Sequence, residues 1–139
     1  MDPASDRADL TMTREWRAAT AHGELAAIAA LIAAGADVDA RDEHGQTALM
    51  NAARDGRADV AQLLIAHGAD LNHRAKYNLT ALMLAVLRGH REIVALLVAA
   101  GADLSVRGTG APGFHDLTAA DLARARGDAE SATLLDSTS

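Results

Sequence analysis

The sequence predicts an all-α protein built from repeated pairs of short helices. Three observations support this fold class. The tripeptide GAD occurs at residues 35–37, 68–70 and 101–103, and a fixed period of this length is typical of a solenoid. The tripeptide TAL recurs with the same period, at residues 47–49 and 80–82. Finally, the chain has only one Trp, one Tyr and one Phe, so its core must consist of small aliphatic side chains, which suit closely packed helices.

Each period carries the signals of two helices. In the period 41–73, Thr47 is placed to cap a first helix, whose apolar residues recur at helical spacing. Gly56 ends that helix. A second helix is expected in DVAQLLIAH, and Gly68 fits the left-handed position after its C-terminus. Each period is therefore expected to be two antiparallel helices and an extended connector.

The spacing of the repeated threonines predicts an insertion in the last unit. Thr118 follows Thr80 by five residues more than the repeat period, and these extra residues fall between Arg107 and Thr118. Residues 1–12 are polar and acidic, and are expected to form a disordered tail. The remainder, 13–139, divides into a partial N-terminal unit and three further units, at about 14–40, 41–73, 74–106 and 107–139.

The stretch HGQTALMNAARDGRADVAQLLIAHGADLN resembles an ankyrin repeat, and the similarity covers about residues 13–136. It implies a solenoid of about four helix-turn-helix units joined by β-turn fingers. The family favours Pro and His in a TPLH stretch, where this chain has Ala48 and Met50. The hydrogen bonds that this His makes to the connectors are therefore expected to be missing. The turn glycine, Gly45, becomes Asn78 and Asp116 in the later units, and both residue types tolerate a left-handed backbone.

The stretch GTGAPG, residues 108–113, has the glycine spacing of dinucleotide-binding loops. That chemistry also needs a strand before the loop and a helix that opens at its last glycine. Neither is predicted, because the loop belongs to the insertion and the next helix follows Thr118. Two interpretations remain open: an enlarged flexible turn, or a contact loop that lifts Phe114 and His115 into solvent.

Composition excludes several classes of protein. The chain has no Cys, so it has neither disulfides nor thiolate metal ligands. Its net charge of −6 argues against general binding of nucleic acid. No stretch is apolar and long enough for a membrane span, and the first residues do not resemble a signal peptide. We therefore expect a cytoplasmic monomer that binds neither nucleic acid nor membranes.

No catalytic, cofactor or metal site is predicted. The six histidines are dispersed over different units, without the pairing on one helix face that a zinc site needs. Asp37, Asp70 and Asp103 recur with the repeat, so we assign them to hydrogen bonds in the connectors. Trp16 falls at a core position of the repeat.

The resemblance implies instead a partner-binding surface at the fingertips and the outer ends of the first helices. Two rows of arginines, one at the finger starts and one on the first helices, are expected to line the same groove and to favour an acidic partner. The alternative is that these arginines only solvate exposed helix faces. The predicted contact residues are Arg41, Glu43, His44, Gln46, Arg54, Asp55, Arg74, Lys76, Tyr77, Leu79, Leu87, Arg88, Arg107, Phe114, His115, Leu117 and Arg126.

The repeat thus favours a non-enzymatic protein-binding module, such as an adaptor, an inhibitor or the neutralising partner of a toxin. Two other hypotheses stay open. One is a small-molecule-binding or catalytic protein that uses the loop 108–117. The other is a structural subunit that associates with itself through the groove.

Overall fold

The computed structural model describes residues 12–110 and 114–137, and within them it confirms the all-α repeat fold. The only β-pairing in these ranges is an isolated bridge between Arg41 and Thr47. A short 3-10 turn, η1 (Lys76–Asn78), lies in one connector. The α-helices are α2 (Arg14–His22), α3 (Leu25–Ala33), α4 (Ala48–Asp55), α5 (Ala58–Ala66), α6 (Ala81–Leu87), α7 (Arg91–Ala100), α8 (Ala119–Ala125) and α9 (Ala129–Ser137).

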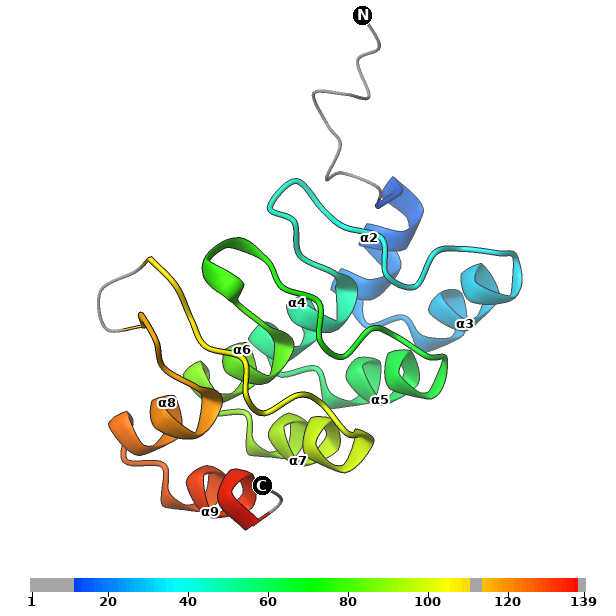
Figure 1. Cartoon of the computed structure of the whole chain (residues 1–139). Helices are drawn as coiled ribbons and strands as arrows, with labels where there is room; N and C mark the ends of the chain where they lie inside the picture. The colour runs from blue at the N-terminus through cyan, green and yellow to red at the C-terminus, as the bar shows by residue number, and fades with distance from the viewer. Residues whose placement is uncertain (1–11, 111–113, 138–139) are drawn as a thin grey trace, which may run out of the picture.

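The helices form two rows. Figure 1 shows the first helices of the pairs (α2, α4, α6, α8) side by side in one row and the second helices (α3, α5, α7, α9) in the other. The connectors after α3, α5 and α7 project to the same side of the molecule, where they form what we call the first, second and third fingers (Figure 1). Within the described residues, the main contacts of each helix pair are with the neighbouring pairs, as in other solenoids.

The repeated threonines fix where each first helix begins. Each has an extended backbone, and its hydroxyl accepts a hydrogen bond from the backbone N–H three residues further on, which would otherwise be unpaired. The donors to Thr13, Thr47, Thr80 and Thr118 are the backbone nitrogens of Trp16, Met50, Met83 and Asp121, at 3.1, 3.3, 3.2 and 3.2 Å.

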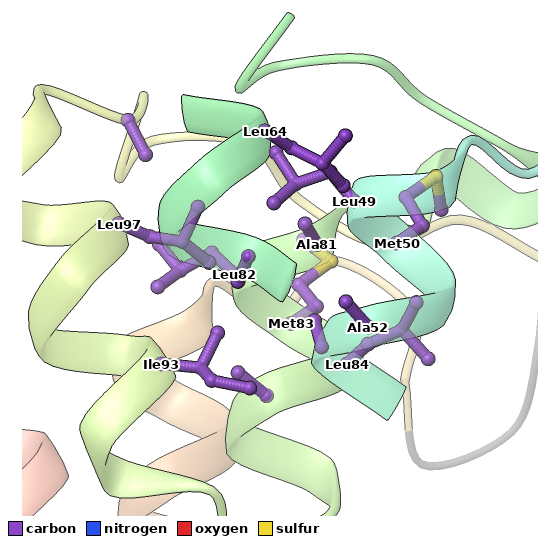
Figure 2. Packing of buried hydrophobic residues seen from close by; sticks show 14 of the residues in the cluster. Leu49, Met50, Ala52, Leu64, Ala81, Leu82, Met83, Leu84, Ile93 and Leu97 are labelled. Carbon is purple, nitrogen blue, oxygen red and sulfur yellow. The ribbon is translucent and has the colours of Figure 1, made fainter. Parts of the chain in front are cut away.

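The core lies between the two rows and consists of small aliphatic side chains. Figure 2 shows Leu49, Leu64, Leu82 and Leu97 gathered between α4, α5, α6 and α7. The expectation that Trp16 is a core residue is confirmed, because only 1% of its surface is exposed. Met12 is also buried in the core and its backbone N–H donates to the Arg41 carbonyl at 2.8 Å. The predicted tail is therefore wrong at its last residue, and residues 1–11 lie outside the described ranges.

Hydrogen bonds hold each connector in shape and also link neighbouring connectors. The predicted role of the GAD aspartates is confirmed: Asp37, Asp70 and Asp103 each accept a bond at 2.9 Å from the backbone N–H two residues on. The expected loss of the histidine bonds from the TPLH position is partly offset from elsewhere. His73 bonds through Nε2 to the Gly45 carbonyl at 2.8 Å, which ties the first finger to the second.

The turn inside each helix pair needs glycine, and two of these glycines form a matched test. Gly56 and Gly127 have φ angles of 78° and 73°, but only at Gly56 would a Cβ atom meet a neighbour, at 2.6 Å from Cε1 of His90. Gly127→Ala is expected to cost about 1 to 2 kcal/mol for the left-handed backbone alone. Gly56→Ala should cost measurably more, because it also displaces the His90 ring from the Arg54 carbonyl, 3.1 Å away. Urea unfolding of both variants measures the difference; equal losses would contradict the role of His90.

Candidate functional site

Two adjacent hollows lie on the finger side of the molecule. The fingertip cleft, of about 680 Å³, runs between the first and second fingers and is lined by Arg41, Glu43, His44, Gly45, Gln46, His73, Arg74, Ala75, Lys76, Tyr77 and Leu79. The helix groove, of about 300 Å³, lies between α2, α4 and the first finger and is lined by Met12, Arg17, Thr20, Ala21, Asp42, Glu43, His44, Asn51, Ala52, Arg54, Asp55 and Arg57. Glu43 and His44 border both, so the two hollows adjoin at the first fingertip.

The first finger is held from within by Asp42. This buried carboxylate accepts hydrogen bonds from the backbone N–H groups of His44 and Gln46, at 2.8 and 3.0 Å, and from the Asn51 amide at 3.2 Å. Gly45 closes the turn with a φ of 73°. Because the backbone is fixed by these bonds, the side chains of Glu43 and His44 project from a defined position.

The second finger carries an unusual backbone. Asn78 has a φ of 60°, so its predicted left-handed conformation is confirmed, but Tyr77 before it also has a φ of 63°. For a bulky residue this conformation costs about 1 to 2 kcal/mol, and such strain is concentrated at functional sites. Tyr77 remains 44% exposed. Its carbonyl accepts a hydrogen bond from the N–H of Thr109 at 2.9 Å, which braces the second finger against the third.

The third finger differs from the prediction. Phe114 is only partly exposed: it packs against the core and covers Gly108, where an added Cβ would lie 2.4 Å from its ring. Of the two interpretations left open, the contact loop that lifts Phe114 into solvent is therefore wrong for Phe114, because packing the aromatic ring against the core is more favourable than exposing it to water. His115 is exposed, and its Nδ1 accepts a hydrogen bond from Gly110 at 3.2 Å. Asp116 has the expected left-handed backbone, with a φ of 64°.

The described part of GTGAPG gives no support to a phosphate-binding loop. Gly108 and Thr109 donate their N–H groups to the carbonyls of Leu117 and Tyr77, at 3.0 and 2.9 Å. These donors are therefore already used within the fingers. The next helix, α8, begins only at Ala119. Residues 111–113 of the stretch lie outside the described ranges.

Arginines of the two predicted rows border different hollows. Arg41 and Arg74 border the fingertip cleft, whereas Arg54 borders the helix groove. The remaining predicted contacts do not line either hollow: Leu87, Arg88, Arg107, Phe114, His115, Leu117 and Arg126. Arg107 is engaged within its own finger, where it donates to the Asp116 carbonyl at 2.8 Å.

Two arginines of the helix groove, Arg54 and Arg17, are paired within the molecule. Arg54 donates from Nε to Asp55 at 3.0 Å, and this hydrogen bond lowers the pKa of the Asp55 carboxyl. Arg17 reaches across from α2 to the first finger, where both carboxylate oxygens of Glu43 accept from its guanidinium. Hydrogen bonding to Arg17 holds the pKa of Glu43 well below its usual range. An acidic partner would have to displace these carboxylates to reach the arginines.

Cations of the fingertip cleft are more available. Arg74 and Lys76 are exposed, and across the two described ranges neither forms a salt bridge with an acidic side chain. The Lys76 ammonium lies 5.0 Å from the centre of the Tyr77 ring, within the range of a cation–π interaction. The second finger therefore presents two cations and an aromatic ring together.

Several residues of the hollows were absent from the sequence prediction. Arg17, Asn51 and Arg57 supply polar walls of the helix groove. Asn51 Oδ1 and Arg57 Nε are buried without a hydrogen-bond partner among the described atoms. The sequence did indicate that α2 borders the groove. When the turn glycines Gly23 and Gly56 are aligned, Ala21 of α2 occupies the same repeat position as Arg54, which was a predicted contact. The N-terminal unit was nevertheless left out of the predicted surface.

Other kinds of site gain no support from the described residues. No three His, Cys, Asp or Glu side chains within 12–110 and 114–137 gather as metal ligands would. None of the helices in these ranges is long and apolar enough to cross a membrane.

Comparison with known proteins agrees with the repeat architecture. A family model described as ankyrin repeats (3 copies) matches residues 16–107, whereas comparison with curated proteins gives no significant match. Ankyrin repeats are generally protein–protein interaction modules and are typically non-enzymatic. The matched segment covers most of the chain and contains both hollows except Met12. By this match and by its stacked helix pairs, the chain belongs to the ankyrin repeat family.

Proposed function

We propose that this chain is a non-enzymatic module that binds one protein partner through the fingertip cleft and the helix groove. The observation that carries this proposal is that Glu43 and His44 border both hollows, which therefore adjoin at the first fingertip. Together they offer a partner one surface that spans two fingers and two first helices. Separate hollows on opposite faces would not do so.

The residue types in the hollows also support a protein ligand. Arginine and tyrosine are enriched among residues that dominate binding energy, and the cleft contains Arg41, Arg74 and Tyr77. The excess of cations there favours a partner with an acidic surface. Arg88, Arg107, His115 and Arg126 are exposed outside the hollows, and we assign them to the edge of the interface. The role is that of an adaptor, an inhibitor or a toxin-neutralising protein, acting as a monomer so that both hollows remain open.

A site-specific cross-linker tests this surface. We expect p-benzoylphenylalanine at position 44, where the His44 side chain is 70% exposed, to cross-link one defined partner in the native host. The same cross-linker at Gln62, an exposed residue of α5 outside both hollows, should not capture that partner. Mass spectrometry of the cross-linked band identifies the product. Capture of the same protein from Gln62 alone would place the interface on the other face.

A further inference from the structure

We infer that the fingertip cleft is the seat of a short, extended acidic segment of the partner, with an apolar side chain of that segment against Tyr77 and Leu79. This inference rests on the proposed function, and it names the chemistry that one part of the surface recognises.

The distribution of charge pairing points to the cleft rather than to the helix groove. Several arginines elsewhere are paired with an acid, such as Arg91 with Asp128 at 2.9 Å and Arg124 with Asp136 at 3.0 Å. In the helix groove Arg54 and Arg17 are paired in this way, whereas Arg57 forms no salt bridge within the described ranges. The acid of the fingertip cleft, Glu43, is already held by Arg17. The carboxylate that borders the cleft is therefore already bonded to Arg17. A carboxylate of a partner could instead form ion pairs with Arg74 and Lys76.

The floor of the cleft calls for an apolar group beside the acid. Leu79 is half-buried there, and Tyr77 exposes 44% of its surface. The volume of the fingertip cleft, about 680 Å³, lies within the usual range for ligand sites. An extended segment directs alternate side chains to opposite sides. It can therefore place an acidic side chain on Arg74 and Lys76 while its neighbours contact the ring or leave the cleft.

The third finger sets the position of the Tyr77 ring. A Cβ on Gly110 would lie only 2.9 Å from Cδ1 of Tyr77, so the ring rests directly on that glycine. The hydrogen bond from Thr109 to the Tyr77 carbonyl holds the backbone beneath it. Because the strained backbone of Tyr77 is supported from the neighbouring finger, the ring is presented to the cleft in one orientation. Gly110 is thus a positioning residue for this site.

A labelled peptide tests the inference on the full chain. The probe is a fluorescein-labelled decapeptide, EDLEDLEDLE, and binding is followed by fluorescence anisotropy against its KKLKKLKKLK counterpart. We expect the acidic peptide alone to bind, with affinity that falls as salt rises. Arg74→Glu with Lys76→Glu should weaken binding at least about tenfold, and Tyr77→Ala about as much. The matched control, Arg14→Glu with Arg124→Glu, makes the same change in net charge at exposed residues outside both hollows and outside the edge of the interface, and should stay within about threefold of the unmodified chain.

Amide chemical shifts of the ¹⁵N-labelled chain locate the peptide and reveal other occupants. Shift changes confined to residues 41–46 and 73–79 support the inference. Equal weakening by the two double variants would overturn it, because binding would then follow net charge alone. Tighter binding after deletion of residues 1–11 would assign the cleft to the chain's own acidic segment. Concentration-dependent shifts without peptide would assign it to a second copy, and tighter binding of an oligonucleotide than of the peptide would assign it to nucleic acid; each outcome overturns an acidic protein partner.

The two proposals can fail separately. If the peptide does not bind but the cross-linker at position 44 captures a partner, the protein-binding function stands and the acidic segment is wrong. If the cross-linker captures nothing at either position while the peptide binds at the cleft, the charge inference stands and the partner surface as a whole is wrong. Gly110→Ala adds a test that does not depend on net charge. This substitution should weaken binding of the acidic peptide, because it displaces the Tyr77 ring without altering any charge.

Discussion

Replacing Leu82 by alanine is expected to lower the free energy of unfolding by about 2 to 5 kcal/mol. Leu82 belongs to α6, in the middle of the stack, and only 2% of its surface is exposed. Helix α6 packs against α4, α7 and α8, so the cavity left by the missing side chain cannot close by a movement of one neighbour. Because each helix pair rests mainly on its neighbours, a loss in the central pair weakens the interfaces on both sides.

Urea unfolding followed by far-UV circular dichroism measures this loss. Leu25→Ala is the matched control, since it removes the same atoms from a side chain that is 39% exposed. We expect it to change the free energy of unfolding by less than about 1 kcal/mol. Similar losses in the two variants would mean that α6 is not the centre of the core.

Replacing Asp128 by alanine is expected to cost about 2 to 3 kcal/mol. Its carboxylate, 7% exposed, lies just before α9 and accepts three hydrogen bonds. The donors are the Ser131 backbone N–H at 3.2 Å, the Ser131 hydroxyl at 2.7 Å and Arg91 Nε at 2.9 Å. Asp128 therefore both begins α9 and ties it to α7. Arg91→Ala should cost less than about 1 kcal/mol, because that guanidinium is largely exposed, and thermal unfolding of the two variants separates these contributions.

The same carboxylate should make stability depend on pH. Burial alone would raise the pKa of the Asp128 carboxyl. The hydrogen bonds from Ser131 and Arg91 outweigh burial, so in the folded protein the pKa of this carboxyl lies below its ordinary value. The unfolded chain therefore takes up the proton first as pH falls. The contribution of Asp128 is complete above about pH 5 and is lost as pH falls through about 3.9 toward the folded pKa.

Asp128→Asn provides the control for this pH dependence, because it keeps the shape of the side chain but cannot ionise. The difference in unfolding free energy between the unmodified chain and this variant should shrink as pH is lowered from 6 to 3. Other aspartates titrate in both proteins and cancel in the difference. A gap that is constant over this range would show that the charge of Asp128 is not what stabilises α9.

Local features of the fold were predictable because their causes are local. A threonine that caps a helix bonds only three residues ahead, and a left-handed turn depends on the residue that occupies it. The roles of Thr47 and Asn78 can therefore be predicted from the residues next to them in the chain. Since such features recur with the repeat, one period predicted the next. The left-handed backbone of Tyr77 could not be predicted in this way, because it is supported by Thr109, which belongs to the following unit.

The surface depended on contacts between units, which spacing does not reveal. One interpretation of the insertion placed Phe114 in solvent, but its ring covers Gly108. Glu43 was expected to contact a partner, but its carboxylate accepts hydrogen bonds from Arg17 of the neighbouring unit. Pairing of this kind is decided by side chains that lie close in space.

The sequence by itself determined the all-α repeat, its period, the capping residues and the place of the insertion, because each follows from chain-local hydrogen bonding and apolar spacing. Tertiary structure alone decided which cations are neutralised, where the two hollows meet and how the third finger supports Tyr77. These properties arise between units, where stacking brings together side chains that lie about one repeat or more apart in the chain.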